Sequence, residues 1–122
     1  MRKNTLVLGA SLNTERYSNL AIKKLRANNF VTFAIGAKMG KVLDVDVFTN
    51  KIDFNEQEID TVTLYLNPKR QEEYYDYILA LKPNRVIFNP GTENGAFFEL
   101  LNVNQIGFEQ ACTLVLLNTN QY

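Results

Sequence analysis

The chain alternates short apolar runs with segments in which apolar residues recur every three or four positions. Short runs rich in apolar and β-branched residues are typical of strands, whereas the longer repeat is typical of a helix with one buried face. Because the two patterns alternate, we expect an α/β domain with a mostly parallel sheet and helices on both faces. Strands are predicted at residues 5–8, 30–35, 61–66, 85–88 and 106–109, with at best a short edge strand at residues 46–48.

Helices are predicted from the same pattern and from the residues that begin and end them. Ser18 is the expected N-cap of the first helix, which ends at residues 28–29. Asn67 and Pro68 are a strong start for the second helix, and Pro83 marks its end. A third, short helix is expected at residues 96–101, and residues 113–117 form a final apolar run.

Four of the predicted strands end in loops of small, polar or turn-forming residues. In a parallel sheet such loops share the carboxyl edge, where open α/β sheets bind ligands. If the strand order is 3-2-1-4-5, the first and fourth strands are neighbours, and the loops at residues 9–11 and 67–68 flank one crevice. The four loops are Gly9-Ala10-Ser11, Gly36-Ala37-Lys38, Asn67-Pro68 and Asn89-Pro90-Gly91-Thr92.

The first of these loops predicts a phosphate-bearing ligand. Its small residues let an anion approach the backbone, and the helix that follows directs N–H groups and the positive end of its dipole toward the turn. Ser11 and Thr14 occupy positions that a dinucleotide fingerprint gives to glycine. The second strand ends at Lys38 instead of an acidic residue for a ribose 2′-hydroxyl, which favours a phosphorylated ribose. A simple tight turn is the alternative interpretation.

Several side chains near these loops have two interpretations each. Arg16 could bind a phosphate through two parallel hydrogen bonds, or it could be a solvated surface arginine. Lys38 and Lys41 lie near glycine turns, where a lysine is usually just exposed. The tyrosines at positions 74, 75 and 77 favour packing and surface roles over a stacking site. Cys112 lies beside an apolar run, which is typical of a buried small residue.

Composition narrows the class of protein. A chain of 122 residues suits a single domain, here residues 1–122, and 46% hydrophobic with 21% charged residues is typical of a globular protein. Equal numbers of basic and acidic residues, 13 of each, give no reason to expect general binding to nucleic acid. No run approaches the roughly 20 apolar residues of a membrane helix, and no signal peptide is recognisable. We expect a cytoplasmic protein.

The absence of histidine and the single cysteine restrict the chemistry. Without histidine the chain has no Ser-His-Asp or Cys-His arrangement, no imidazole metal ligand and no phosphohistidine. A lone Cys112 forms neither an internal disulfide nor a cysteine-cluster metal site. We therefore expect no metal and no catalytic residue of these kinds, while chemistry by Lys, Tyr, Asp or Glu stays open.

Five blocks of sequence carry a resemblance to a known family. They are GASLNTERYSN, AIGAKMGKV, DTVTLYLNP, LKPNRVIFNPGTEN and EQACTLVLLNTNQY, and they cover essentially the whole chain. Together they resemble the small stand-alone CoA-binding proteins of the succinyl-CoA-synthetase-like CoA-binding domain family. The resemblance implies a single Rossmann-like domain of three layers that holds coenzyme A, or an acyl-CoA, at the carboxyl edge of its sheet.

The resemblance also implies which residues bind the ligand. The loop after the first strand and the start of the first helix would receive the nucleotide phosphates, and the basic residue after the second strand would face the 3′-phosphate. The loop after the fourth strand would lie beside the adenine or pantetheine portion, and the loop after the fifth strand would lie closest to the reactive end. In that order, the implied residues are Gly9, Ala10, Ser11, Asn13, Arg16, Tyr17 and Ser18; Lys38; Tyr65, Leu66, Asn67 and Pro68; and Asn89, Pro90, Gly91, Thr92 and Glu93.

The chain departs from the family pattern at several positions. Thr14 stands where the family usually has proline, and Gly95 follows Asn94 where proline is common. The first loop and the start of the third helix are therefore expected to be less constrained. Asn120 replaces a glycine, and asparagine tolerates a positive φ better than most residues. These departures bear on affinity and leave the class of ligand unchanged.

Three functions are compatible with these observations. The first is binding of coenzyme A without catalysis, because related ligases use a phosphohistidine-bearing domain, and this chain contains neither that domain nor a histidine. The second is an NADP-type nucleotide-binding enzyme or a subunit of an acyl-CoA ligase. The third is a CoA-responsive interaction module in which Cys112 forms a mixed disulfide with the CoA thiol. A homodimer or a partner protein stays open in each case.

Overall fold

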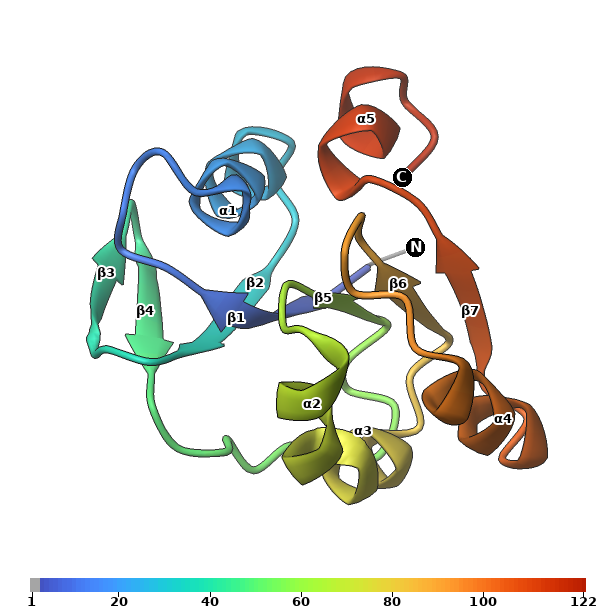
Figure 1. The fold of residues 1–122 in the computed structure, drawn as a ribbon. Helices are drawn as coiled ribbons and strands as arrows, with labels where there is room; N and C mark the ends of the chain where they lie inside the picture. Colours follow the sequence, from blue (N-terminus) through green and yellow to red (C-terminus); the bar gives the residue numbers. More distant parts are fainter. Residues whose placement is uncertain (1–2) are drawn as a thin grey trace.

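The computed structural model describes residues 3–122 as one seven-stranded sheet with flanking helices (Figure 1). The strand order is β3-β4-β2-β1-β5-β6-β7, and each neighbouring pair is parallel except β3 with β4. The strands are β1 (Thr5–Ala10), β2 (Thr32–Gly36), β3 (Gly40–Val42), β4 (Val45–Phe48), β5 (Thr61–Leu64), β6 (Arg85–Phe88) and β7 (Gly107–Gln110). The helices are α1 (Tyr17–Ala27), α2 (Pro68–Gln71), the 3₁₀ turn η1 (Glu72–Tyr74), α3 (Tyr75–Leu81), α4 (Gly95–Val103) and α5 (Thr113–Asn118).

Helices cover both faces of the sheet, which gives three layers. Figure 1 shows α1 and α5 on one face and α2, α3 and α4 on the other. Side chains of β1 alternate between the faces: Leu6 and Leu8 pack in the cluster that contains α3 and α4 residues, whereas Val7 packs with α1 and α5 residues. All three are fully buried, and each such side chain contributes about 1.5–3 kcal/mol. The three-layer α/β architecture is confirmed.

The central strand order agrees with the prediction, but the edge does not. The predicted order 3-2-1-4-5 corresponds to β4-β2-β1-β5-β6, in which β1 pairs with both β2 and β5. The segment predicted as an edge strand, β4, is instead covered by β3, which pairs with it in antiparallel register. Val42, Val45 and Val47 are buried in alternation with exposed residues, so the two strands share one apolar face against the α1 layer.

The beginning of α1 differs from the prediction. The N-cap position belongs to Arg16, which makes no capping hydrogen bond with its side chain, and Ser18 is a buried residue of the first turn. A turn closed by the Arg16 N–H on the Asn13 carbonyl, at 3.1 Å, brings the chain into the helix two residues early. The N-cap expected for the second helix is confirmed, since the Asn67 side chain accepts a hydrogen bond from the Arg70 N–H at 2.9 Å.

The final apolar run is a helix, α5, which packs beside α1 on the same face of the sheet (Figure 1). After it, Asn120 adopts a φ of 57°, the left-handed conformation that asparagine tolerates. The chain then returns to the sheet, where Tyr122 is buried against Phe30 with ring centroids 5.0 Å apart. Among residues 3–122, none of the helices has the length and apolar character needed to cross a membrane.

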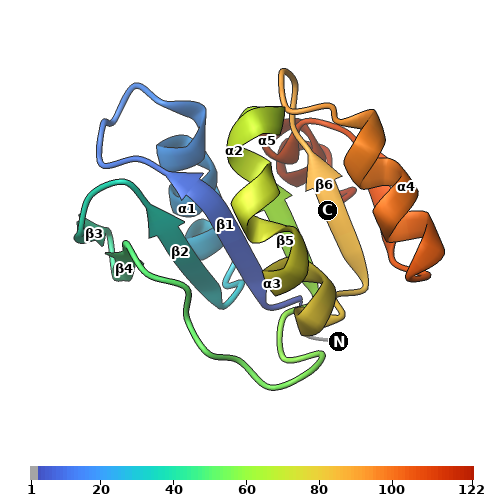
Figure 2. The ribbon, with the colours of Figure 1, turned by 60° about the horizontal axis from the view of Figure 1, so that its bottom comes forward.

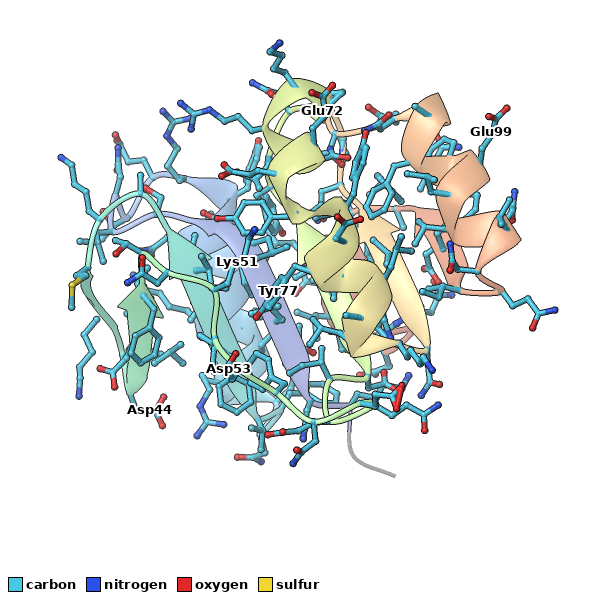
Figure 3. All side chains as sticks on the ribbon, turned by 90° about the horizontal axis from the view of Figure 1, so that it is seen from below. Asp44, Lys51, Asp53, Glu72, Tyr77 and Glu99 are labelled. Atoms are coloured by element: carbon cyan, nitrogen blue, oxygen red, sulfur yellow. The ribbon has the colours of Figure 1, made fainter. Side chains whose placement is uncertain are left out.

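A strap, which we define as residues 49–60, crosses the face covered by α3 without forming a helix or strand. The Tyr77 hydroxyl of α3 donates a hydrogen bond to the Ile52 carbonyl at 2.6 Å. The Lys51 ammonium lies 5.4 Å from the ring centroid of Tyr74 in η1. Figure 3 shows Lys51 and Tyr77 close together on this face. These contacts hold the strap against the α2–α3 segment.

Candidate functional site

A cavity of about 810 Å³ lies at the carboxyl edge of the sheet, where the loops after β1, β2, β5 and β6 meet. Figure 2 shows these loops gathered beyond the arrowheads of the central strands. The expected crevice between the first and third of the predicted loops is therefore present. The cavity is lined by Gly9, Ala10, Ser11, Arg16, Tyr17, Ser18, Ile35, Gly36, Ala37, Thr49, Tyr65, Leu66, Asn67, Arg70, Glu73, Tyr74, Pro90, Gly91 and Thr92.

Two glycines allow the backbones around the cavity to approach each other closely. Gly9 has a φ of 90°, and a Cβ atom there would lie 2.8 Å from the Tyr65 carbonyl carbon. A Cβ atom at Gly36 would lie only 2.1 Å from the Ala10 carbonyl oxygen. The contact at Gly36 falls where the register between β1 and β2 shifts, between Leu8 and Ala10. Small residues are therefore required for the chain to leave the sheet here.

Hydrogen bonds within the loop after β1 hold it in one conformation. The Ser11 hydroxyl accepts from the Asn13 N–H at 3.1 Å, and the Asn13 side chain accepts from the Glu15 N–H at 2.9 Å. The Asn19 side-chain amide, buried in the first turn of α1, donates to the Ser11 carbonyl at 2.9 Å. The loop is thus tied to the helix that follows it. Asn13 serves the loop itself and does not line the cavity.

The charged side chains that line the cavity are Arg16, Arg70 and Glu73. Within residues 3–122, neither arginine forms an ion pair. By contrast, the Arg26 guanidinium binds the Asp44 carboxylate at 2.9 and 2.8 Å, and this pairing lowers the pKa of Asp44. Arg85 lies 3.6 Å from the Glu109 carboxylate. The cavity therefore contains two cations without an anionic partner, which suits an anionic ligand.

The loop after β6 is held by buried hydrogen bonds. The Asn89 side chain is buried, donates to the Thr63 hydroxyl and the Leu64 carbonyl at 2.7 and 2.9 Å, and accepts from the Thr113 N–H at 2.8 Å. The Gln71 side chain on α2 donates to the Thr92 carbonyl at 2.8 Å. Asn89 therefore supports the loop from below, while Pro90, Gly91 and Thr92 face the cavity.

The tyrosines that line the cavity differ in burial. Tyr17 is exposed, at 72%, whereas the Tyr65 hydroxyl is buried near Thr63 and Thr113 without a hydrogen bond of normal geometry among residues 3–122. Burial raises the pKa of Tyr65 above its ordinary range. Burial, together with the charge of Glu73, also raises the pKa of Tyr74. Both phenols are therefore neutral at neutral pH.

The structure brings most of the residues implied by the resemblance to this one cavity. Lys38, in contrast, is exposed in the turn between β2 and β3, and Cys112 is half-buried before α5; neither lines the cavity. The implied residues that line it are Gly9, Ala10, Ser11, Arg16, Tyr17, Ser18, Tyr65, Leu66, Asn67, Pro90, Gly91 and Thr92, and those that do not are Asn13, Lys38, Pro68, Asn89 and Glu93.

Sequence reasoning missed the wall of the cavity formed by α2, η1 and the strap. Arg70, Glu73 and Tyr74 belong to the α2–η1 segment, and Thr49 begins the strap. The packing and surface roles expected for Tyr74, Tyr75 and Tyr77 are confirmed, since all three pack against the core, and Tyr74 lines the cavity in addition. One feature of the sequence could have indicated this wall: Arg70 and Glu73 are three residues apart, so on a helix they lie on the same face. The other missed residues, Ile35, Gly36 and Ala37, end β2.

Comparison with known proteins identifies the class. A model of the CoA binding domain family matches residues 3–118, and the chain belongs to this family. Membership of this family supports a CoA-binding role. A comparison with curated proteins gave no match.

Solved structures share the fold. The chain is similar to an uncharacterized protein of known crystal structure, with 43% sequence identity, a TM-score of 0.93, and coverage of 100% of this chain and 99% of that one. A hypothetical protein from Pyrococcus horikoshii OT3 has 21% identity and a TM-score of 0.79 over 94% of this chain and 82% of that one. A protein from Thermus thermophilus has 18% identity and a TM-score of 0.85 over 99% and 91%. At these lower identities the likeness concerns the fold alone.

Proposed function

We propose that the protein binds coenzyme A or an acyl-CoA in the cavity at the carboxyl edge of its sheet, without catalysing a reaction. The observation that carries the proposal is the cavity itself, where the end of β1, the start of α1 and two arginines without an ion-pair partner among residues 3–122 meet. Membership of the CoA binding domain family supports the choice of ligand. The nucleotide phosphates are assigned to the Gly9-Ala10-Ser11 loop.

The size and chemistry of the cavity fit this ligand. Its volume of about 810 Å³ lies within the range of about 300–1,000 Å³ that is usual for cofactor sites. Gly9 and Gly36 allow neighbouring backbone segments to meet closely at the edge of the cavity, and Arg16 stands where the chain enters α1. Backbone N–H groups and the dipole at the start of a helix favour phosphate, as does a guanidinium.

The ligand is proposed to extend from the β1–α1 loop toward the loop after β6. Tyr65, Leu66 and Asn67 border the middle of this path, and Pro90, Gly91 and Thr92 border its far end. None of these six residues has a charged side chain, which suits the pantetheine arm more than a phosphate. The Gln71 side chain bridges the Leu66 and Thr92 carbonyls, both at 2.8 Å, and so fixes the two loops relative to each other.

The ionisable groups of the cavity support a binding role without catalysis. The phenols of Tyr65 and Tyr74 have raised pKa values and do not act as bases at neutral pH. Arg16 and Arg70 each bring a guanidinium, which donates hydrogen bonds and accepts none, to the cavity. Glu73 is exposed and lies beside Tyr74. These groups can hold and orient an anionic ligand.

Isothermal titration calorimetry with CoA, dephospho-CoA and NADP tests the proposal. We expect binding of CoA at micromolar concentrations and a loss of roughly tenfold or more in affinity for Arg16→Met, because a charge-assisted hydrogen bond is removed. Lys24→Met, which removes an exposed cation of α1 outside the cavity, is the matched control and should bind as the wild type does. Absence of CoA binding at high micromolar concentration would contradict the proposal. Tight binding of NADP with no response to CoA would favour a nucleotide-dependent enzyme instead.

A further inference from the structure

We propose that Arg70 binds the 3′-phosphate of coenzyme A and so determines the preference for CoA over dephospho-CoA. The inference rests on the proposed function and adds a residue from a different wall of the cavity. Arg70 lies on α2, in the helical layer opposite the one that α1 belongs to (Figure 2). Arg16 precedes α1, so the two arginines approach the cavity from different layers.

The net positive charge of the cavity depends on Arg70 as much as on Arg16. Arg16, Arg70 and Glu73 are its charged side chains, which leaves one net positive charge. If Arg70 were neutral, Arg16 and Glu73 would balance each other, and no net positive charge would face the ligand. Glu73 follows Arg70 by one helical turn, yet among residues 3–122 the two form no ion pair. The Arg70 guanidinium is therefore available to an incoming anion.

Coenzyme A carries a phosphate that is separate from its diphosphate. A diphosphate occupies the loop and Arg16 in the proposed mode, and the 3′-phosphate is a separate monoester dianion that needs a cation of its own. Lys38, the residue that the resemblance implied for this phosphate, is exposed and does not line the cavity. Among the described residues, Arg70 is the remaining cation that does line it. A guanidinium also suits a phosphate because it can donate two parallel hydrogen bonds.

The test compares CoA with dephospho-CoA, since the two ligands differ only in the 3′-phosphate. Affinities are measured by calorimetry for the wild type, Arg70→Met, Lys38→Met and the neighbouring control Lys69→Met, whose side chain is exposed and outside the cavity. We expect Arg70→Met to weaken CoA binding by roughly tenfold or more and dephospho-CoA binding by less than about twofold. Lys38→Met and Lys69→Met should leave both affinities within about twofold of the wild type.

Each other outcome overturns the assignment. If Arg70→Met lost affinity for CoA and dephospho-CoA equally, Arg70 would bind the diphosphate instead. If it lost affinity for neither ligand, Arg70 would not belong to the site. A selective loss in Lys38→Met, or equal affinity of the wild type for both ligands, would also exclude the role of Arg70 while leaving CoA binding intact. A wild type that binds neither ligand contradicts the proposed function itself. Because Arg70 is exposed, its variants are expected to fold, and Arg70→Gln provides a second neutral replacement.

Discussion

At Gly36 the backbones of β2 and β1 are so close that a Cβ atom would lie 2.1 Å from the Ala10 carbonyl oxygen and 3.0 Å from the Ala10 carbonyl carbon. Both atoms belong to the backbone, which cannot rotate away as a side chain can. Gly36 also lines the cavity, beside the end of β1, whose last residues Gly9 and Ala10 had been expected in a loop. The size of this one residue therefore links the stability of the central strand pair to the shape of the proposed binding site.

Gly36→Ala is expected to destabilise the protein by about 1–3 kcal/mol, because β1 and β2 must separate to admit the methyl group. Urea denaturation measures this loss. CoA affinity should fall as well, since the loop after β1 moves with the strand. Gly95→Ala is the control: it begins α4, has no atom within 4 Å of an added Cβ, and should be neutral or slightly stabilising. Equal stability of the two variants would show that the contact at Gly36 is relieved without cost.

At the scale of elements, the α2–α3 segment and the strap form a wall joined by hydrogen bonds and aromatic contacts. The segment is not one continuous α-helix, because the 3₁₀ turn η1, which contains Glu73 and Tyr74, separates α2 from α3. The Tyr77 hydroxyl holds the strap through the Ile52 carbonyl, and the Phe33 and Phe54 rings meet with centroids 5.0 Å apart. Since Thr49 and Tyr74 both line the cavity, these contacts also shape the site.

The hydroxyl of Tyr77 should make this wall sensitive to alkaline pH. Burial raises the pKa of Tyr77 to about 12 in the folded protein, compared with 10.0 for an ordinary tyrosine. The neutral phenol therefore contributes stability that is complete below about pH 10 and is lost as the pH rises toward 12. Urea denaturation at pH 8, 10 and 11 should show this decline in the wild type, and Tyr77→Phe should decline less steeply.

Tyr77→Phe should also lose about 0.5–1.5 kcal/mol at pH 8, where the hydrogen bond to the Ile52 carbonyl is intact in the wild type. The exposed Tyr17, replaced by phenylalanine, is the control for removal of a phenol without burial. Burial also raises the pKa values of Tyr65 and Tyr122, and both residues remain in Tyr77→Phe. The stability of that variant should therefore still decline in part at alkaline pH. If the free energy of unfolding depended on pH identically in the wild type and in Tyr77→Phe, the phenol of Tyr77 would not contribute to the alkaline loss of stability.

At the scale of the whole molecule, Arg85 joins segments that are distant in sequence. Its guanidinium donates to the Thr61 hydroxyl at 2.9 Å and to the Tyr122 carbonyl at 3.2 Å, and it lies 4.4 Å from the Tyr122 ring centroid. Lys3 also donates to the Tyr122 carbonyl, which ties the segment before β1 to the one after α5. With 16% of its side chain exposed, Arg85 forms the most buried of the ion pairs among residues 3–122.

Arg85→Met is expected to reduce stability by about 1–3 kcal/mol, because it removes two hydrogen bonds from a charged group and leaves the buried Thr61 hydroxyl without that donor. Lys82→Met, which breaks an exposed pair with Glu56, should change stability by less than about 1 kcal/mol. Thermal denaturation of both variants compares the two ion pairs directly. A larger effect from Lys82→Met would contradict the ranking by burial. CoA affinity should be unchanged in Arg85→Met, since Arg85 lies outside the cavity.

Much of the fold was predictable because its signals are local. The run at residues 85–88 was expected as a strand and is one, and Asn67 with Pro68 begins a helix as expected. The start of α1 was not, because a turn at residues 13–16 takes precedence over the capping preference of Ser18. Likewise, β3 is short, and its pairing with β4 depends on valines that are buried only when α1 packs above them.

The sequence by itself determined the loops at the carboxyl edge, since Gly9, Ser11 and Arg16 lie within a few residues of β1 and share its position wherever the sheet goes. Only the tertiary structure decided which distant cations reach the same cavity: Arg70 lines it and Lys38 does not. The physical reason is that sequence periodicity shows which face of a segment is buried and which is exposed to solvent, but not which other segment covers it. The wall opposite the loop depends on where α2 and the strap pack on the sheet, and that is set by contacts between segments far apart in the chain.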